Sequence, residues 1–139
     1  MFCLVPGSGE VLIKVEACGI CGADIETIEG VEKGIEYPRV PGHEVVGTIA
    51  QLSEQVPAYL KLGQCVGVGH LGGHCNACEQ CRFGHFNLCL NLPVTGSSRD
   101  VGYAEYMLVQ ATGWWLSQKI SLLLTQHLCS ARVSLLLIR

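Results

Sequence analysis

The sequence is poor in charged and in aromatic residues. Asp, Glu, Lys and Arg make up only 15% of its 139 residues, 6% are aromatic, and the net charge is −3. A chain without a basic excess lacks the electrostatic footprint of a nucleic-acid or anionic-membrane binder, so we expect neither as a partner. The hydrophobic content of 49% exceeds that of disordered chains. We therefore expect a folded domain with its own core.

We also expect no secretory leader, because residues 1–9 have neither a charged start nor a long apolar run. The nine cysteines do not make an even disulfide framework. Clustered thiols without a leader indicate metal binding in a reducing compartment. We expect a cytoplasmic protein.

Strong helix-forming runs are few before residue 110, and the chain holds 17 glycines. Alternating or β-branched segments bounded by glycine turns predict four strands, at residues 10–17, 45–50, 62–69 and 102–109. Residues 25–30 predict a short helix or a loop. Short strands joined by glycine turns favour a mainly β fold, and specifically a partly open β-barrel.

The most specific motif is a C-x2-C-x2-C-x7-C pattern made by Cys75, Cys78, Cys81 and Cys89. Four thiolates at this spacing can close a tetrahedron around Zn²⁺. A lobe this small cannot bury enough apolar surface to fold alone, so the metal would stabilise it. Ordinary thiols, a redox C-x-x-C pair and an iron–sulfur cluster are the alternatives. A closed four-cysteine site has no open coordination position, which favours a structural zinc.

A second candidate group contains Cys21 and His43, each at a turn beside a predicted strand end. A thiolate and an imidazole are ligand types that suit Zn²⁺. Asp24 and Glu44 lie close by in sequence and could orient the ligands. One cysteine and one histidine are weak evidence by themselves, since a histidine satisfied within the core is commoner.

Four ordered segments resemble the N-terminal catalytic domain of the zinc-dependent medium-chain alcohol dehydrogenases. They are Val11–Asp24, Pro41–Gly47, the four-cysteine lobe and Gly102–Tyr106, and the resemblance covers residues 5–113. It implies a GroES-like β-barrel with a structural zinc on the four cysteines of the lobe, and a separate catalytic zinc.

Carried over by position, the resemblance implies that Cys21 and His43 are ligands of the catalytic zinc. Glu44 would lie close to this zinc as a carboxylate neighbour and a possible ligand. Asp24 would be a nearby acid that does not bind the zinc but contacts its ligands. The implied reaction converts an alcohol to an aldehyde or ketone by hydride transfer to NAD(P), with zinc as Lewis acid. Members of the family commonly form homo-oligomers. The alternatives are a catalytically inactive zinc-binding fragment and a metal-dependent interaction module.

Two departures from the family pattern bear on activity. Many members carry a Ser or Thr two residues after the ligand cysteine, where this chain has Ala23, whose side chain cannot relay a proton. The 139 residues also leave no room for a nucleotide-binding Rossmann domain, and we expect no strand followed by its glycine-rich fingerprint. By itself the chain is expected to be inactive.

Residues 114–139 do not resemble the family. Codons compatible with this tail, read so that each new codon starts at the third base of the old one, permit a family-like stretch with a cysteine whose codon straddles Ser130 and Ala131. We therefore hypothesise a frame slip, missplicing or an error in gene prediction near Gly113. The coding sequence decides the question, because codons that cannot yield those residues refute the hypothesis. A helix packed on the barrel over residues 120–138 is the alternative, and Arg132 argues against a membrane span.

Overall fold

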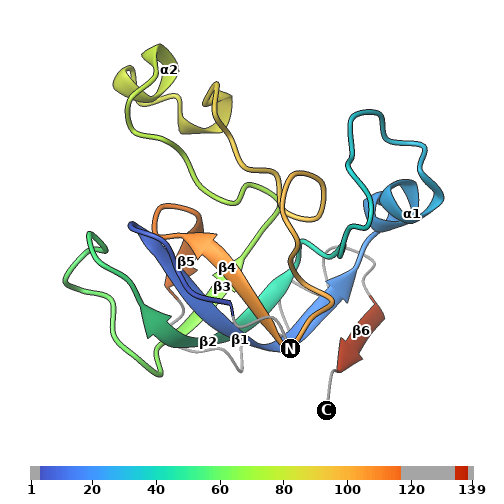
Figure 1. The fold of residues 1–139 in the computed structure, drawn as a ribbon, viewed down its shortest axis with the longest axis horizontal. Coiled ribbons are helices and arrows are strands. Elements are labelled where there is room, and N and C mark those ends of the chain that lie inside the picture. Colours follow the sequence, from blue (N-terminus) through green and yellow to red (C-terminus); the bar gives the residue numbers. More distant parts are fainter. Residues whose placement is uncertain (1–3, 117–133, 138–139) are drawn as a thin grey trace.

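The computed structural model describes residues 4–116 and 134–137. In chain order its elements are β1 (Glu10–Ile20), α1 (Gly22–Glu29), β2 (Val45–Leu52), β3 (Cys65–Val68), α2 (Glu79–Arg82), the 3-10 helix η1 (Phe86–Leu88), β4 (Tyr106–Gln110), β5 (Trp114–Leu116) and β6 (Ser134–Leu137). The strands form one antiparallel sheet in the order β4-β1-β2-β3-β5, with β6 paired to β1 (Figure 1). The prediction of a mainly β fold is confirmed.

The core is built on the alternation of β1, whose side chains at Val11, Ile13 and Val15 are buried. Ile13 lies opposite Ile49 of β2 and Met107 of β4, and all three side chains are at most 2% exposed. Because successive residues of a strand point to opposite faces, this register gives the sheet one continuous apolar face.

All four strands differ in their bounds from those predicted. β2 runs two residues past its predicted end, to Leu52, and β3 covers only Cys65–Val68 of the segment predicted at residues 62–69. β1 runs three residues past the predicted end, to Ile20, because Cys18 still pairs with β2. β4 begins at Tyr106, four residues after the predicted start. The residues before it are held by another segment, since the N–H of Val101 donates to the Val40 carbonyl at 3.2 Å.

The sheet continues into the tail. β5 pairs with β3, and β6 pairs with Ala17–Ile20 at the end of β1. The helix considered for residues 120–138 is therefore wrong at Ser134–Leu137, while residues 117–133 lie outside the described part. Within the described ranges, helices are too short or too polar to cross a bilayer.

Gly47 of β2 lies where the backbones of β1 and β2 approach most closely. A Cβ atom at Gly47 would lie 2.3 Å from the Lys14 carbonyl oxygen, whereas one at Gly67 of β3 would be no closer than 3.8 Å to any atom outside its neighbours. Overpacking of this kind costs about 1–3 kcal/mol.

We expect Gly47→Ala to lower the free energy of unfolding by that amount, because the sheet must open around the new methyl group. Gly67→Ala, in the adjacent strand, is the matched control and should lie within about 0.5 kcal/mol of the wild type. Urea unfolding followed by circular dichroism measures both. Equal stabilities of the two variants would contradict the close approach.

Candidate metal centres

The first candidate centre lies in a lobe that leaves the sheet after β3 and returns before β4. α2 and η1 belong to this lobe and stand away from the sheet (Figure 1). At its base Leu71 pairs with Val94, and the N–H of Gly72 donates to the Pro93 carbonyl at 2.8 Å. The lobe is thus a long loop whose two ends are paired with each other where they join the barrel.

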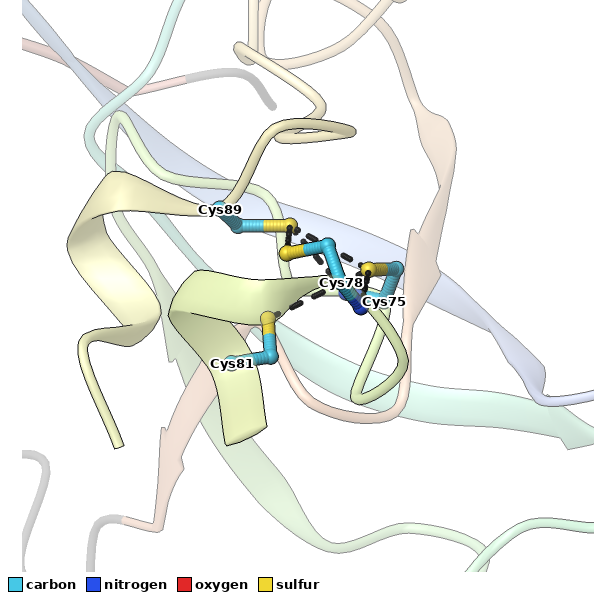
Figure 2. A group of neighbouring side chains, drawn as sticks. All are labelled: Cys75, Cys78, Cys81 and Cys89. Carbon is cyan, nitrogen blue, oxygen red and sulfur yellow. Dashed lines mark hydrogen bonds between the residues drawn. The ribbon is translucent and has the colours of Figure 1, made fainter. Parts of the chain in front are cut away.

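The four predicted cysteines of the lobe converge on one point (Figure 2). The Sγ atom of Cys75 lies 3.9 Å from that of Cys81 and 3.6 Å from that of Cys89, while Cys78 and Cys89 are 4.0 Å apart. A disulfide would need about 2.0 Å. Zn–S bonds of about 2.3 Å in a tetrahedron place neighbouring sulfurs about 3.8 Å apart. The spacing of the sulfurs fits a four-thiolate zinc site.

Local N–H groups prepare the lobe thiols for metal binding. The N–H of Cys78 and the Nδ2 amide of Asn91 donate to Cys75 Sγ at 3.3 and 3.5 Å. Hydrogen bonds from the backbone at Ala77, from Asn91 and from the backbone of Cys78 lower the pKa of Cys75 to about 5. Burial instead raises the pKa of Cys81 to about 12. These hydrogen bonds favour the thiolate form of Cys75, which is the form that binds a metal.

The second candidate centre lies where β1 ends and β2 begins. Cys21 immediately precedes α1, and His43 and Glu44 immediately precede β2. The N–H of Gly19 donates to the Glu44 carbonyl at 2.8 Å, which ties the two strand ends together. One ligand atom from each of Cys21, His43 and Glu44 lies within 4.8 Å of the others. The fold thus brings Cys21 close to His43 and Glu44, although they are far apart in the sequence.

Asp24 lies beneath this centre and is 2% exposed. Its Oδ2 accepts from the N–H of Cys21 at 2.8 Å and from the hydroxyl of Tyr103 at 2.8 Å. Its Oδ1 accepts from the N–H of Gly42 at 3.1 Å and lies 3.2 Å from His43 Nδ1. Because Nδ1 faces the carboxylate, the other ring nitrogen, Nε2, remains for a metal.

Two further observations fit a cation at this centre. Glu44 Oε2 is buried without a hydrogen-bond partner, and a buried carboxylate oxygen needs a cation, a proton or a donor. A thiolate, an imidazole and a carboxylate make a donor set that suits Zn²⁺.

Sequence reasoning missed two residues near this centre. Tyr103 was placed only in a predicted strand and in the family-like segment Gly102–Tyr106, and His70 was not assigned to either centre. The His70 ring instead packs edge-on against the His43 ring, with centroids 5.1 Å apart. No pattern in the sequence indicates either contact, because both depend on tertiary packing. Ala23, the departure from the family pattern, lies in the first turn of α1.

One expectation about glycines needs correction. Gly67, Gly69 and Gly72 do have the spacing G-x-G-x-x-G; Gly67 lies within β3, and Gly69 and Gly72 follow it. The chain then enters the lobe, and the next helix, α2, begins only at Glu79 and is four residues long. A dinucleotide fingerprint requires the glycine turn to open a helix whose N-terminus receives the pyrophosphate. The spacing is therefore not a nucleotide site.

A curved antiparallel sheet with a four-cysteine lobe and a Cys–His–Glu group at its strand ends defines a zinc-type GroES-like domain. The alcohol dehydrogenase GroES-like domain family matches residues 7–119. The chain therefore belongs to the zinc-dependent medium-chain alcohol dehydrogenase family, and matches its N-terminal domain. The predicted family and GroES-like fold are confirmed.

Relatives and solved structures agree with this assignment. The chain is 45% identical over 106 residues to the alcohol dehydrogenase patD of Aspergillus clavatus, covering 76% of this chain and 27% of that protein. It is 41% identical over 105 residues to L-galactonate-5-dehydrogenase of Escherichia coli, covering 76% and 30%. A zinc-binding dehydrogenase from Sinorhizobium meliloti bound to NADP has a TM-score of 0.70 at 35% identity, covering 81% and 32%. The chain thus spans less than a third of the length of each.

The lobe thiols should differ in reactivity once metal is removed. In chelator-treated protein at pH 7, we expect iodoacetamide to modify Cys75 well before Cys81, because only the thiolate reacts. Lowering the pH toward 5 should slow modification of Cys75, whose pKa is about 5. Cys18, whose pKa burial raises to about 11, is the slow control. Peptide mass spectrometry follows each site, and equal rates at Cys75 and Cys81 would refute the order.

Proposed function

We propose that the chain is the metal-binding catalytic domain of an alcohol dehydrogenase-type oxidoreductase. The observation that carries the proposal is the convergence of Cys21, His43 and Glu44 above the buried Asp24. In this proposal Cys21 and His43 are ligands of a catalytic zinc, and Glu44 is a third, carboxylate ligand. Asp24 holds the His43 ring by its Nδ1 atom.

These residues divide the work of the site. Asp24 orients His43, and the backbone bond between Gly19 and Glu44 keeps the ligands at their spacing. Zinc, when bound, would supply Lewis acidity toward an alcohol oxygen. Ala23 offers no hydroxyl to take the alcohol proton, so the proton must leave through water or another side chain.

The lobe has a different role in this proposal. Cys75, Cys78, Cys81 and Cys89 hold a structural zinc, because four thiolates leave no position for a substrate. The lobe contributes few side chains to the apolar core. The free energy of metal binding therefore stabilises the lobe's fold.

The reaction that we propose is oxidation of a small alcohol, or reduction of an aldehyde, by hydride exchange with NAD(P). Support comes from the names of the relatives and from the NADP bound in the Sinorhizobium meliloti structure. Within the described residues there is no nucleotide-binding element. In this proposal hydride transfer needs a nucleotide-binding domain of the family.

A metal-dependent interaction module is the second candidate. Exposed apolar side chains on the lobe favour it: Phe83 is 70% exposed, Leu88 57% and Leu90 72%. Exposed apolar side chains, where they gather into a patch, are typical of contacts with other protein surfaces. Both candidates require the lobe zinc, and only the first requires Cys21 and His43.

Metal content separates the two centres. After exhaustive dialysis we expect one zinc per chain, because four thiolates bind zinc tightly whereas the Cys21, His43 and Glu44 centre exchanges it. Cys81→Ser should lose that zinc, and Cys65→Ser on β3 should keep it, since Cys65 lies outside both metal clusters. Mass spectrometry of metals measures the ratio. Two retained zincs, or one retained by Cys81→Ser, would contradict the assignment.

Activity is tested in a chimera that replaces the corresponding domain of the patD relative with residues 7–113. We expect NAD(P)-linked alcohol oxidation by the chimera. His43→Ala should lower kcat/KM by more than about 100-fold, the upper range for residues that only support a metal ligand, while Cys65→Ser should leave it unchanged. A folded, zinc-loaded chimera that does not turn over would exclude the catalytic role and favour the interaction module.

A further inference from the structure

Tyr103 reaches the second centre from a distant part of the chain. It follows Gly102, which packs so tightly on Gly42 that a Cβ atom at Gly102 would lie 2.7 Å from the Gly42 Cα. The N–H of Tyr103 donates to the Pro41 carbonyl at 3.0 Å. The tyrosine backbone is therefore fixed against the segment that carries His43.

The hydroxyl of Tyr103 is aimed at Asp24. It donates to Asp24 Oδ2 at 2.8 Å, and the same oxygen lies 3.3 Å from the Gly19 carbonyl. A hydroxyl has one proton, so the shorter contact, to the charged acceptor, receives it. Burial and the hydrogen bond to Asp24 raise the pKa of Tyr103. The phenol therefore remains a donor throughout the neutral range.

Each oxygen of Asp24 then has its own task. Oδ2 is held by the N–H of Cys21 and the hydroxyl of Tyr103, and Oδ1 meets the N–H of Gly42 and His43 Nδ1. The side-chain torsion of a carboxylate is broad and soft. Without the hydroxyl, Oδ2 keeps only one donor, and rotation of the carboxylate moves Oδ1 away from His43.

We propose that Tyr103 is a positioning residue for the metal centre, acting through Asp24 to hold His43 as its Nδ1–H tautomer with Nε2 free to bind metal. This inference rests on the proposed centre at Cys21, His43 and Glu44. A purely structural tyrosine would instead contribute through its ring, and loss of the hydroxyl would change only stability.

The tautomer of His43 is the first test, and it needs no metal. Long-range ¹⁵N–¹H correlation spectra of the chelator-treated wild type should show Nδ1 protonated and Nε2 unprotonated. Tyr103→Phe keeps the ring but should give a tautomer mixture with a growing Nε2–H form. Tyr106→Phe, at the start of β4, is the matched control and should match the wild type. A wild type with Nε2 protonated, or a variant spectrum identical to it, would overturn the proposal.

Cobalt affinity is the second test. Chains with zinc in the lobe are titrated with Co²⁺, and the thiolate-to-cobalt absorption of Cys21 reports binding at the second centre. We expect Tyr103→Phe to weaken that binding by about 10–100-fold, the effect of removing a partner of a metal ligand, and Tyr106→Phe to leave it unchanged. Unchanged affinity in Tyr103→Phe would overturn the role of the hydroxyl.

The two failures can be told apart. A wild type that gives no cobalt absorption refutes the proposed metal centre itself, while the comparison of the His43 tautomer between wild type and Tyr103→Phe still decides whether Tyr103 positions the ring. If Tyr103→Phe does not fold, the wild type still tests the proposal, because protonation of His43 at Nε2 and not at Nδ1 would show that Asp24 does not hold the Nδ1–H form and would overturn it.

Discussion

The second centre depends on the hydrogen bonds made by the buried carboxylate of Asp24. It is 2% exposed and accepts from the backbone of Cys21 and Gly42 and from the hydroxyl of Tyr103. Burying a charge without such donors is expensive, so α1, the segment before β2 and the segment before β4 must all be in place at once. The same carboxylate also faces His43. The orientation of the His43 ring therefore depends on the correct folding of all three segments.

The two centres are supported in opposite ways. The lobe cysteines lie close in sequence and are joined by short loops, so the chain needs little tertiary structure to bring them together. Cys21 and His43 instead lie on different strand ends, and the β1–β2 register places them, with Cys18 opposite Val45. A change in the barrel that shifts this register separates the second set of ligands and leaves the lobe unaffected.

This difference explains what the sequence could predict. Spacing alone predicted the lobe, because the ligands are local, and glycine-bounded alternation predicted strands near β1 to β4. Cys21 and His43 were found only through resemblance to a family, since nothing local marks their approach. The Tyr103 hydroxyl bonds a residue 79 positions away in the chain, and the pairing of β5 with β3 involves no alternating pattern in Trp114–Leu116. Contacts of this kind arise from packing and leave no periodic signal.

The closure of the lobe at its base has a consequence for how such domains diversify. Leu71 pairs with Val94, and the intervening chain leaves and rejoins the barrel at neighbouring points. The entropy of closing such a loop grows only slowly with its length. Insertions or deletions between these two residues can therefore accumulate without rethreading the sheet. A lobe attached in this way can lengthen, shorten or lose its cysteines while the order of the strands in the sheet stays the same.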